Sequence, residues 1–159
     1  MRDQRGVSLV ELLVVLIVIG IALRFVVPTV GHFRLTMVQS RAKAMVLEDI
    51  RAARQRAITR HVPVFVAFGN GVTTTNLTDY KVHADTNGDR LVTTGEMVNT
   101  KTLPRDSKLA MVALTPTDTL IFDVSGTLRT GTSGGKVVIT TGTLTDTLAV
   151  SVAGIVYEP

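Results

Sequence analysis

The chain begins with MRDQRG at residues 1–6 and continues with VSLVELLVVLIVIGIAL at residues 7–23, an apolar run that contains one acid, Glu11. An ionisable side chain near the centre of a membrane helix costs about 2.5–3.5 kcal/mol, so it usually has a function and a partner. Cleavage after Gly6 would create that partner, because the new amino group at Val7 would be a cation close to Glu11 of the same chain or of a neighbouring copy. These residues predict a cleaved leader, residues 1–6, and a retained apolar helix.

The apolar segment extends from residue 7 to residue 30, which as a helix is long enough to span roughly 30 Å of hydrocarbon. Pro28 lies near its end and lacks an N–H, which predicts a kink or a local loosening of the helix. Arg2 and Arg5 are expected to stay on the cytoplasmic side of the membrane. The residues that follow the helix are therefore expected in the periplasm or outside the cell.

An ordinary secretory signal peptide is the alternative for this N-terminus. The leader is basic, and residues 20–22, Gly-Ile-Ala, could serve as a small-x-small cleavage site. Glu11 weighs against this alternative, because the apolar region of a signal peptide gains nothing from an acid at its start.

Residues 31–60 show an amphipathic helical pattern, with small or apolar residues at spacings of three and four. The apolar face consists of Val38, Ala42, Val46, Ile50, Ala53 and Ala57, and the other face carries Arg41, Lys43, Glu48, Asp49, Arg51, Arg54, Arg56 and Arg60. The pattern predicts that one face packs on a sheet, as the second half of one long helix.

Residues 61–159 change to a period of two and are rich in Val, Thr and Gly, which predicts a β-rich globular domain. The expected strands are residues 62–68, 80–84, 96–103, 108–114, 119–124, 136–141, 147–152 and 155–157. Turns are expected at residues 69–71, 125–126, 131–135 and 142, where glycine supplies the positive φ angles that tight connections need.

The stretch GVSLVE at residues 6–11 resembles the type III signal of type IV pilins and of type II secretion pseudopilins. The resemblance implies that prepilin peptidase cuts between Gly6 and Val7 and methylates the Val7 amine, and that Glu11 acts in filament assembly. Val7 and Ser8 depart from the usual phenylalanine and threonine. A single-pass protein of the bacterial inner membrane is implied, with its globular domain in the periplasm, which later enters a periplasmic pseudopilus or a surface pilus.

Three further stretches are similar to the GspH/FimT branch of minor pseudopilins and minor pilins: EDIRAARQRAITRHVPV at residues 48–64, DTNGDRLVTTGE at 85–96 and FDVSGT at 122–127. This similarity implies an α+β, type IV pilin-like fold in which a long N-terminal helix packs on a C-terminal domain of antiparallel sheets. Ile155, which follows Gly154, departs from relatives that often place arginine there.

Two functions fit these observations. We favour a minor pseudopilin, a structural subunit at or near the tip of a type II secretion pseudopilus that drives protein export, with other pseudopilins and the inner-membrane assembly platform as partners. The alternative is a minor pilin of a type IV pilus, which primes pilus assembly or binds DNA during natural transformation.

DNA binding is the less favoured of these roles. Four arginines could contact phosphates: Arg51, Arg54, Arg56 and Arg60. Glu48 and Asp49 dilute this patch, however, and residues 151–159 contain no Lys or Arg, although basic residues of the C-terminal tail carry the contact in the DNA-binding relatives. The formal net charge of +4 argues for no particular partner.

The acidic stretch at residues 85–96 has an EF-hand-like spacing. Its oxygen ligands would occupy positions 1, 3, 5, 9 and 12 of a calcium loop and are Asp85, Asn87, Asp89, Thr93 and Glu96. Arg90 stands where position 6 needs glycine, so we prefer a surface loop whose Asp and Asn side chains bond their own backbone. No cofactor is expected, and Ca²⁺ is possible but not favoured.

Nothing in the sequence predicts an enzyme. The three histidines have neither ligand nor triad spacing, and the 159 residues include no cysteine, so thiol-ligated metals and disulfides are excluded.

Overall fold

The computed structural model describes residues 8–68, 77–88, 96, 98–115, 118–129 and 133–159, except for the side chains at 25–30, 111–113, 115 and 133. The chain forms two compact units, residues 1–36 and 37–159. Helix α1, Leu9–Arg60, contributes residues to both. It continues as helix through Pro28, and the predicted kink stays a prediction.

In the first unit, α1 begins with a hydrogen bond in which the amide of Leu12 donates to the carbonyl oxygen of Ser8 over 3.2 Å. Glu11 lies in the first turn, where the partial positive charge of the helix N-terminus favours an acid. All side chains of residues 8–24 are exposed. Among the residues described, no helix combines the length and the hydropathy of a membrane span.

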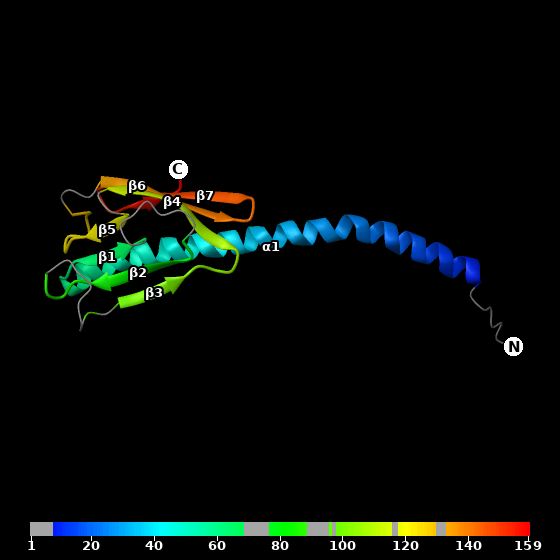
Figure 1. Cartoon of the computed structure of the whole chain (residues 1–159), viewed down its shortest axis with the longest axis horizontal. Coiled ribbons are helices and arrows are strands. Elements are labelled where there is room, and N and C mark those ends of the chain that lie inside the picture. The colour runs from blue at the N-terminus through cyan, green and yellow to red at the C-terminus, as the bar shows by residue number, and fades with distance from the viewer. Residues whose placement is uncertain (1–7, 69–76, 89–95, 97, 116–117, 130–132) are drawn as a thin grey trace. The chain divides into compact units, whose positions relative to one another are not determined.

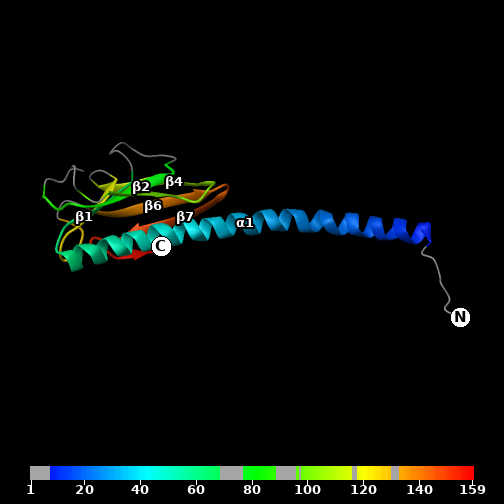
Figure 2. The same cartoon turned by 90° about the horizontal axis from the view of Figure 1, so that it is seen from below.

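In the second unit, the C-terminal part of α1 runs along one side of two sheets (Figure 2). The predicted apolar face is confirmed, because five of its six residues are fully buried and Val38 is half-buried. The buried five are Ala42, Val46, Ile50, Ala53 and Ala57. Burial of these side chains stabilises the domain.

Both sheets are antiparallel and four-stranded, which confirms the predicted α+β class (Figure 1). Sheet A has the order β3-β2-β1-β5, and sheet B has the order β4-β6-β7-β8. The strands of sheet A are β1 Val64–Ala67, β2 Asp79–Ala84, β3 Val98–Thr102 and β5 Thr119–Phe122. Those of sheet B are β4 Ser107–Thr115, β6 Ser133–Thr141, β7 Leu144–Val150 and β8 Val156–Tyr157.

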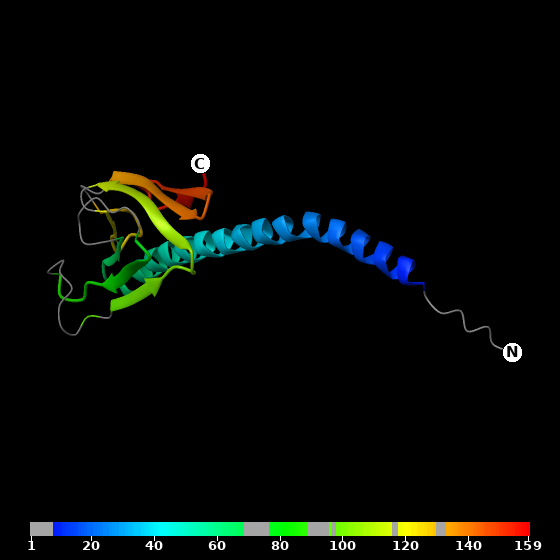
Figure 3. The same cartoon turned by 45° about the vertical axis from the view of Figure 1, so that its right-hand side comes forward.

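The two sheets, seen as separate groups of strands in Figure 3, are joined by backbone hydrogen bonds at two places. Leu109 of β4 donates to the carbonyl of Leu77, just before β2, over 2.8 Å. Leu128, just after β5, donates to the carbonyl of Val152, between β7 and β8, over 3.0 Å. One apolar core includes residues of α1 and of both sheets.

The predicted turns have different outcomes. Gly126 and Gly142 have positive φ angles of 77° and 59°, as expected, and residues 69–71 lie outside the described residues. The turn predicted at residues 131–135 is wrong for Gly134 and Gly135, which belong to β6. A Cβ atom at Gly134 would lie 2.1 Å from the carbonyl oxygen of Val150, so glycine is needed there for a close backbone approach.

Candidate functional site

The predicted N-terminal site is described only in part. Gly6 and Val7 lie outside the described residues, so cleavage and methylation there stay predictions. The side chain of Glu11 is exposed, and its large apolar neighbours from Leu9 to Leu23 are exposed as well. This arrangement presents one acid within an apolar surface that no other described residue of its own unit covers.

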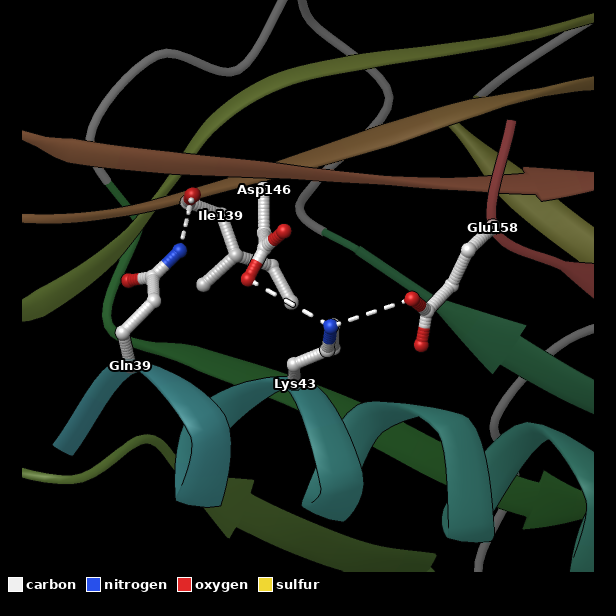
Figure 4. A network of polar contacts seen from close by, with 5 residues as sticks. All are labelled: Gln39, Lys43, Ile139, Asp146 and Glu158. Carbon is white, nitrogen blue, oxygen red and sulfur yellow. Dashed lines mark hydrogen bonds and ion pairs between the residues drawn. The ribbon is translucent and has the colours of Figure 1, made fainter. Parts of the chain in front are cut away.

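Lys43 connects the part of α1 that lies in the second unit to the C-terminal end of the chain (Figure 4). Its ammonium nitrogen lies 3.2 Å from a carboxylate oxygen of Glu158 and 3.6 Å from one of Asp146. One turn earlier, the side-chain amide of Gln39 donates to the backbone carbonyl of Ile139 over 3.0 Å. These contacts hold α1 against β6, β7 and the segment after β8.

The pKa of Lys43 is raised above its ordinary value of 10.5, chiefly by the hydrogen bond to Glu158, although partial burial opposes the shift. The charged form of Lys43 is therefore bound more tightly in the folded chain than in the unfolded one. Sequence analysis placed Lys43 on the solvent face of the helix, whereas it is half-buried.

Asp49 makes a second polar anchor, between α1 and sheet A. The hydroxyl of Tyr80 donates to a carboxylate oxygen of Asp49 over 2.6 Å, and the ammonium of Lys101 lies 3.4 Å from the other oxygen. Burial, with further contributions from Asp49, raises the pKa of the Tyr80 hydroxyl. Tyr80 is buried in the core, and this hydrogen bond satisfies its polar end.

Arg54 makes a third anchor, where the turn after β5 meets the turn before β8. Its Nε donates to the carbonyl oxygen of Gly126 over 2.8 Å. A Cβ atom at Gly126 would lie 2.5 Å from Cδ1 of Ile58, and one at Gly154 would lie 2.5 Å from the oxygen of Gly126. Two glycines with positive φ angles therefore let both turns approach α1.

The structure divides the four arginines of the predicted nucleic-acid patch into two pairs. Arg51 and Arg54 border a hollow of about 270 Å³ with the turn at residues 154–156. Arg56 and Arg60 border a second hollow of about 110 Å³, whose lining also includes Val64, Val82, His83, Ala84 and Asn99. The arginines are therefore distributed over two hollows that share no lining residue.

The acidic loop is described at its two ends, while Asp89 lies outside the described residues. A carboxylate oxygen of Asp85 accepts a hydrogen bond of 2.7 Å from the amide of Gly88, as the loop interpretation predicts. Glu96 accepts one of 3.0 Å from the amide of Thr86. Within the described part of the chain, no three acidic, histidine or cysteine side chains gather as metal ligands. Calcium binding at Asp85, Asn87, Asp89 and Glu96, which the sequence does not favour, stays untested.

Sequence analysis missed the roles of Lys43, Asp49 and Arg54. A charged residue on a helix normally faces solvent, and the partners of these three lie 31 or more residues away along the chain. The one related sequence signal was the turn predicted at residues 125–126, which did not identify α1 as the partner of that turn.

Comparison with known families gives two matches. A family model described as Type II transport protein GspH matches residues 45–154, which is more than half of the chain. A model of the prokaryotic N-terminal methylation motif matches residues 1–23, which include Gly6, Val7 and Glu11. No curated protein matches the chain at a significant level.

Among solved structures, the chain resembles the type IV minor pilin FimU of Pseudomonas aeruginosa, with a TM-score of 0.52. The two chains are 13% identical, and the match covers 83% of this chain and 92% of that one. At this identity the likeness concerns the fold, and it confirms the predicted pilin-like arrangement of an N-terminal helix packed on antiparallel sheets.

Proposed function

This chain belongs to the GspH family of type II transport proteins, and from that premise we propose that it is a structural subunit at or near the tip of a type II secretion pseudopilus. Family and fold make it a pilin-type structural protein, a minor pseudopilin or a minor pilin, which assembles with other pilins into filaments. The observation that carries the finer proposal is the C-terminal tail, residues 151–159, which contains no Lys or Arg for contact with DNA.

Maturation by prepilin peptidase is part of the proposal. Cleavage after Gly6 would leave a methylated amine at Val7, and Glu11 would pair with that cation during docking to a neighbouring subunit. Mass spectrometry of the N-terminus of the mature protein tests this step. A chain that starts at Val7 supports it, whereas a chain that starts at Leu23 would make the protein an ordinary secreted one.

The methylation motif implies anchoring in the inner membrane. We propose a single pass formed by residues 7–30, with the second unit in the periplasm before assembly. An exposed apolar helix of this kind would be covered by lipid in the membrane and by other helices in a filament, because either removes its apolar surface from water. Retention of the chain in membranes after alkaline carbonate washing is the expected result.

The C-terminal tail favours secretion over DNA uptake. Residues 151–159 carry no positive charge, and three of their exposed side chains, Val152, Ile155 and Tyr157, are apolar or aromatic. The alternative, a minor pilin that primes a type IV pilus or binds DNA, is favoured by the four helix arginines and by the likeness to FimU, itself a type IV minor pilin. The chain is expected to bind duplex DNA weakly and without sequence preference.

Deletion of the gene followed by complementation tests the two roles side by side. Loss of protein export with intact piliation and transformation supports the pseudopilus, and the opposite pattern supports the pilus. Gel-shift measurements with the full chain in detergent add a second test, since sub-micromolar binding of duplex DNA at physiological salt would favour DNA uptake.

A further inference from the structure

Near the edge of sheet A that β2 and β3 form, one face of the sheet contacts α1. Directly paired residues share a face of a sheet, and the pairs here are Tyr80 with Lys101 and Val82 with Asn99. Both Tyr80 and Lys101 contact Asp49 of α1, so this is the face that the helix covers. Asn99 therefore lies on the helix-facing side of β3, two residues from Lys101.

The matching stripe of α1 carries Asp49, Arg56 and Arg60, at helical spacings of seven and four. At one end of this stripe the charges are matched, because Asp49 pairs with Lys101. At the other end, Arg56 and Arg60 border the 110 Å³ hollow, where β3 supplies the uncharged Asn99. Arg56 and Arg60 thus share the hollow with an uncharged residue, Asn99, and not with an acid that would pair with them as Asp49 pairs with Lys101.

The arginines of this hollow have no carboxylate within ion-pair distance among the described residues, whereas Lys43 and Asp49 of the same helix each have an oppositely charged partner. The partial negative charge of the helix C-terminus amounts to about half an elementary charge, which is less than two guanidinium groups supply. The ring of His83, another lining residue, stacks on Phe65, its direct pair on the opposite face of sheet A. The hollow is therefore positively charged.

We propose that this Arg56–Arg60 hollow receives an aspartate or glutamate side chain of another protein. Guanidinium groups bind carboxylates with paired hydrogen bonds, and the amide of Asn99 adds a further donor. The aliphatic stem of the acid would pack on the apolar lining, which consists of Val64, Val82 and Ala84.

A DNA backbone is the less suitable ligand for the same hollow. Duplex binding needs a row of cations along successive phosphates, but Arg51 and Arg54 border the other hollow. A phosphate also has no apolar stem that would use the lining of valine and alanine. The protein that supplies the carboxylate need not be a filament subunit. A negative result for this hollow would therefore leave the proposed filament role intact, and the reverse also holds.

Carbodiimide cross-linking tests for a carboxylate directly, because the reagent joins a carboxylate to a nearby amine as an amide and takes up the water released. The full-length Arg60→Lys variant, treated in native membranes, introduces an amine into the hollow. The matched control is Arg51→Lys, an exposed arginine of the same helix that borders the other hollow. Peptide mass spectrometry identifies the acid joined to each position.

A second pair of variants tests whether a carboxylate of the chain itself can compete with the acid of the other protein. Asn99→Asp, added to Arg60→Lys, places a carboxylate of the chain itself on the helix-facing side of β3. Thr100→Asp adds the same charge on the opposite face of the strand, and Thr100 is exposed. The adduct with another protein is expected to fall by roughly tenfold or more with Asn99→Asp, as close charge pairs couple strongly, and to persist with Thr100→Asp.

Support for the proposal is an amide between position 60 and an Asp or Glu of a different protein, formed in clear excess over position 51. The absence of any adduct at position 60, an adduct only with acids of the same chain, or equal yields at positions 51 and 60 would overturn it. Footprinting that shows Arg56 and Arg60 protected by DNA rather than by a protein would overturn it as well. The comparison of positions 60 and 51 decides the matter even if Asn99→Asp does not fold.

Discussion

The two parts of α1 are both helical but differ in what covers their apolar side chains. Ile17, in the first unit, is 54% exposed, whereas Ile50, in the second, is fully buried against the sheets. Charged side chains differ in the same way, because Glu11 is exposed while Lys43, Asp49 and Arg54 contact distant segments. Local helix formation is thus shared by both parts, whereas burial of the helix against sheets is a property of the second part.

Removal of the acid from the first part is expected to have the largest effect. Glu11→Ala should leave leader cleavage and membrane insertion intact, because the segment becomes more apolar. Docking to a neighbouring subunit should weaken by about 3–5 kcal/mol, the cost of leaving a buried charge without its partner. Co-purification with filament partners measures this effect, with Glu48→Ala, an exposed acid of the second part, as control.

Undiminished co-purification of Glu11→Ala, together with full secretion or piliation, would mean that the acid has no role in assembly. In that case Glu11 would be one more exposed acid of the helix, as Glu48 is in the second part.

The same substitution in both parts separates covered from uncovered isoleucines. Ile50→Ala should lower the free energy of unfolding of the second unit by about 2–5 kcal/mol, because it removes buried methyl groups and leaves a cavity. Ile17→Ala should change it by less than about 0.5 kcal/mol. Urea denaturation of each full-length variant in detergent measures both values, and equal values would contradict the comparison.

Gly126 tests how closely the turn after β5 packs on the second part of α1. Gly126→Ala should destabilise the domain by about 1–2 kcal/mol for its positive φ angle alone, with an added cost from the contact with Ile58. Gly88→Ala is the matched control, since its φ of 79° is similar but nothing lies within 4 Å of the added carbon. Thermal unfolding that is the same for both variants would show that the turn does not press on the helix.

The polar anchor of Lys43 should make stability fall at alkaline pH. Its pKa is raised in the folded chain, so its contribution is fully present below pH 10.5 and is lost as pH rises above that value. Lys43→Met should cost about 0.5–1 kcal/mol at pH 7, because both acids are partly exposed, and should reduce the loss above pH 10.5. Tyr80, whose pKa is also raised, adds to this loss at alkaline pH, and Tyr80→Phe should remove that part of it.

Denaturation of both variants at pH 7 and pH 11 provides the measurement. A wild-type chain whose stability rises between these values would contradict the direction of both pKa shifts.

The acidic loop should give the smallest effect. Calcium is expected to stabilise the chain little, with affinity no tighter than the roughly 10⁻⁴ M end of the extracellular range, because Arg90 replaces a glycine and Asp85 already accepts a hydrogen bond from Gly88. Calorimetry of the full chain measures the affinity. Tighter binding that Asp85→Ala abolishes would establish a calcium site.

Much of the local structure could be predicted from the sequence. All eight expected strands are present within a few residues of their predicted ends, and the buried face of α1 was predicted from its spacing alone. These features depend on the repeat of apolar residues along one element, which is a local property. Gly134 shows what local patterns cannot predict. Glycine is needed there because the backbone of Val150, in another strand, lies close to it.

The candidate sites divide in the same way. Gly6, Val7 and Glu11 form a motif within six residues, so the sequence was sufficient to propose their role. The four arginines of the helix were also visible in the sequence, but their division between two hollows depends on the strands and turns that border each hollow.

The sequence by itself therefore determined the elements of this protein: an apolar helix with one acid at its start, an amphipathic continuation and a β-rich domain of pilin type. Only the tertiary structure decided which charged residues contact distant segments and which hollow each arginine borders. The physical reason is that periodicity and turn chemistry act between neighbours in the chain, whereas a charge such as Lys43 depends on partners, here Asp146 and Glu158, that only strand pairing brings within reach.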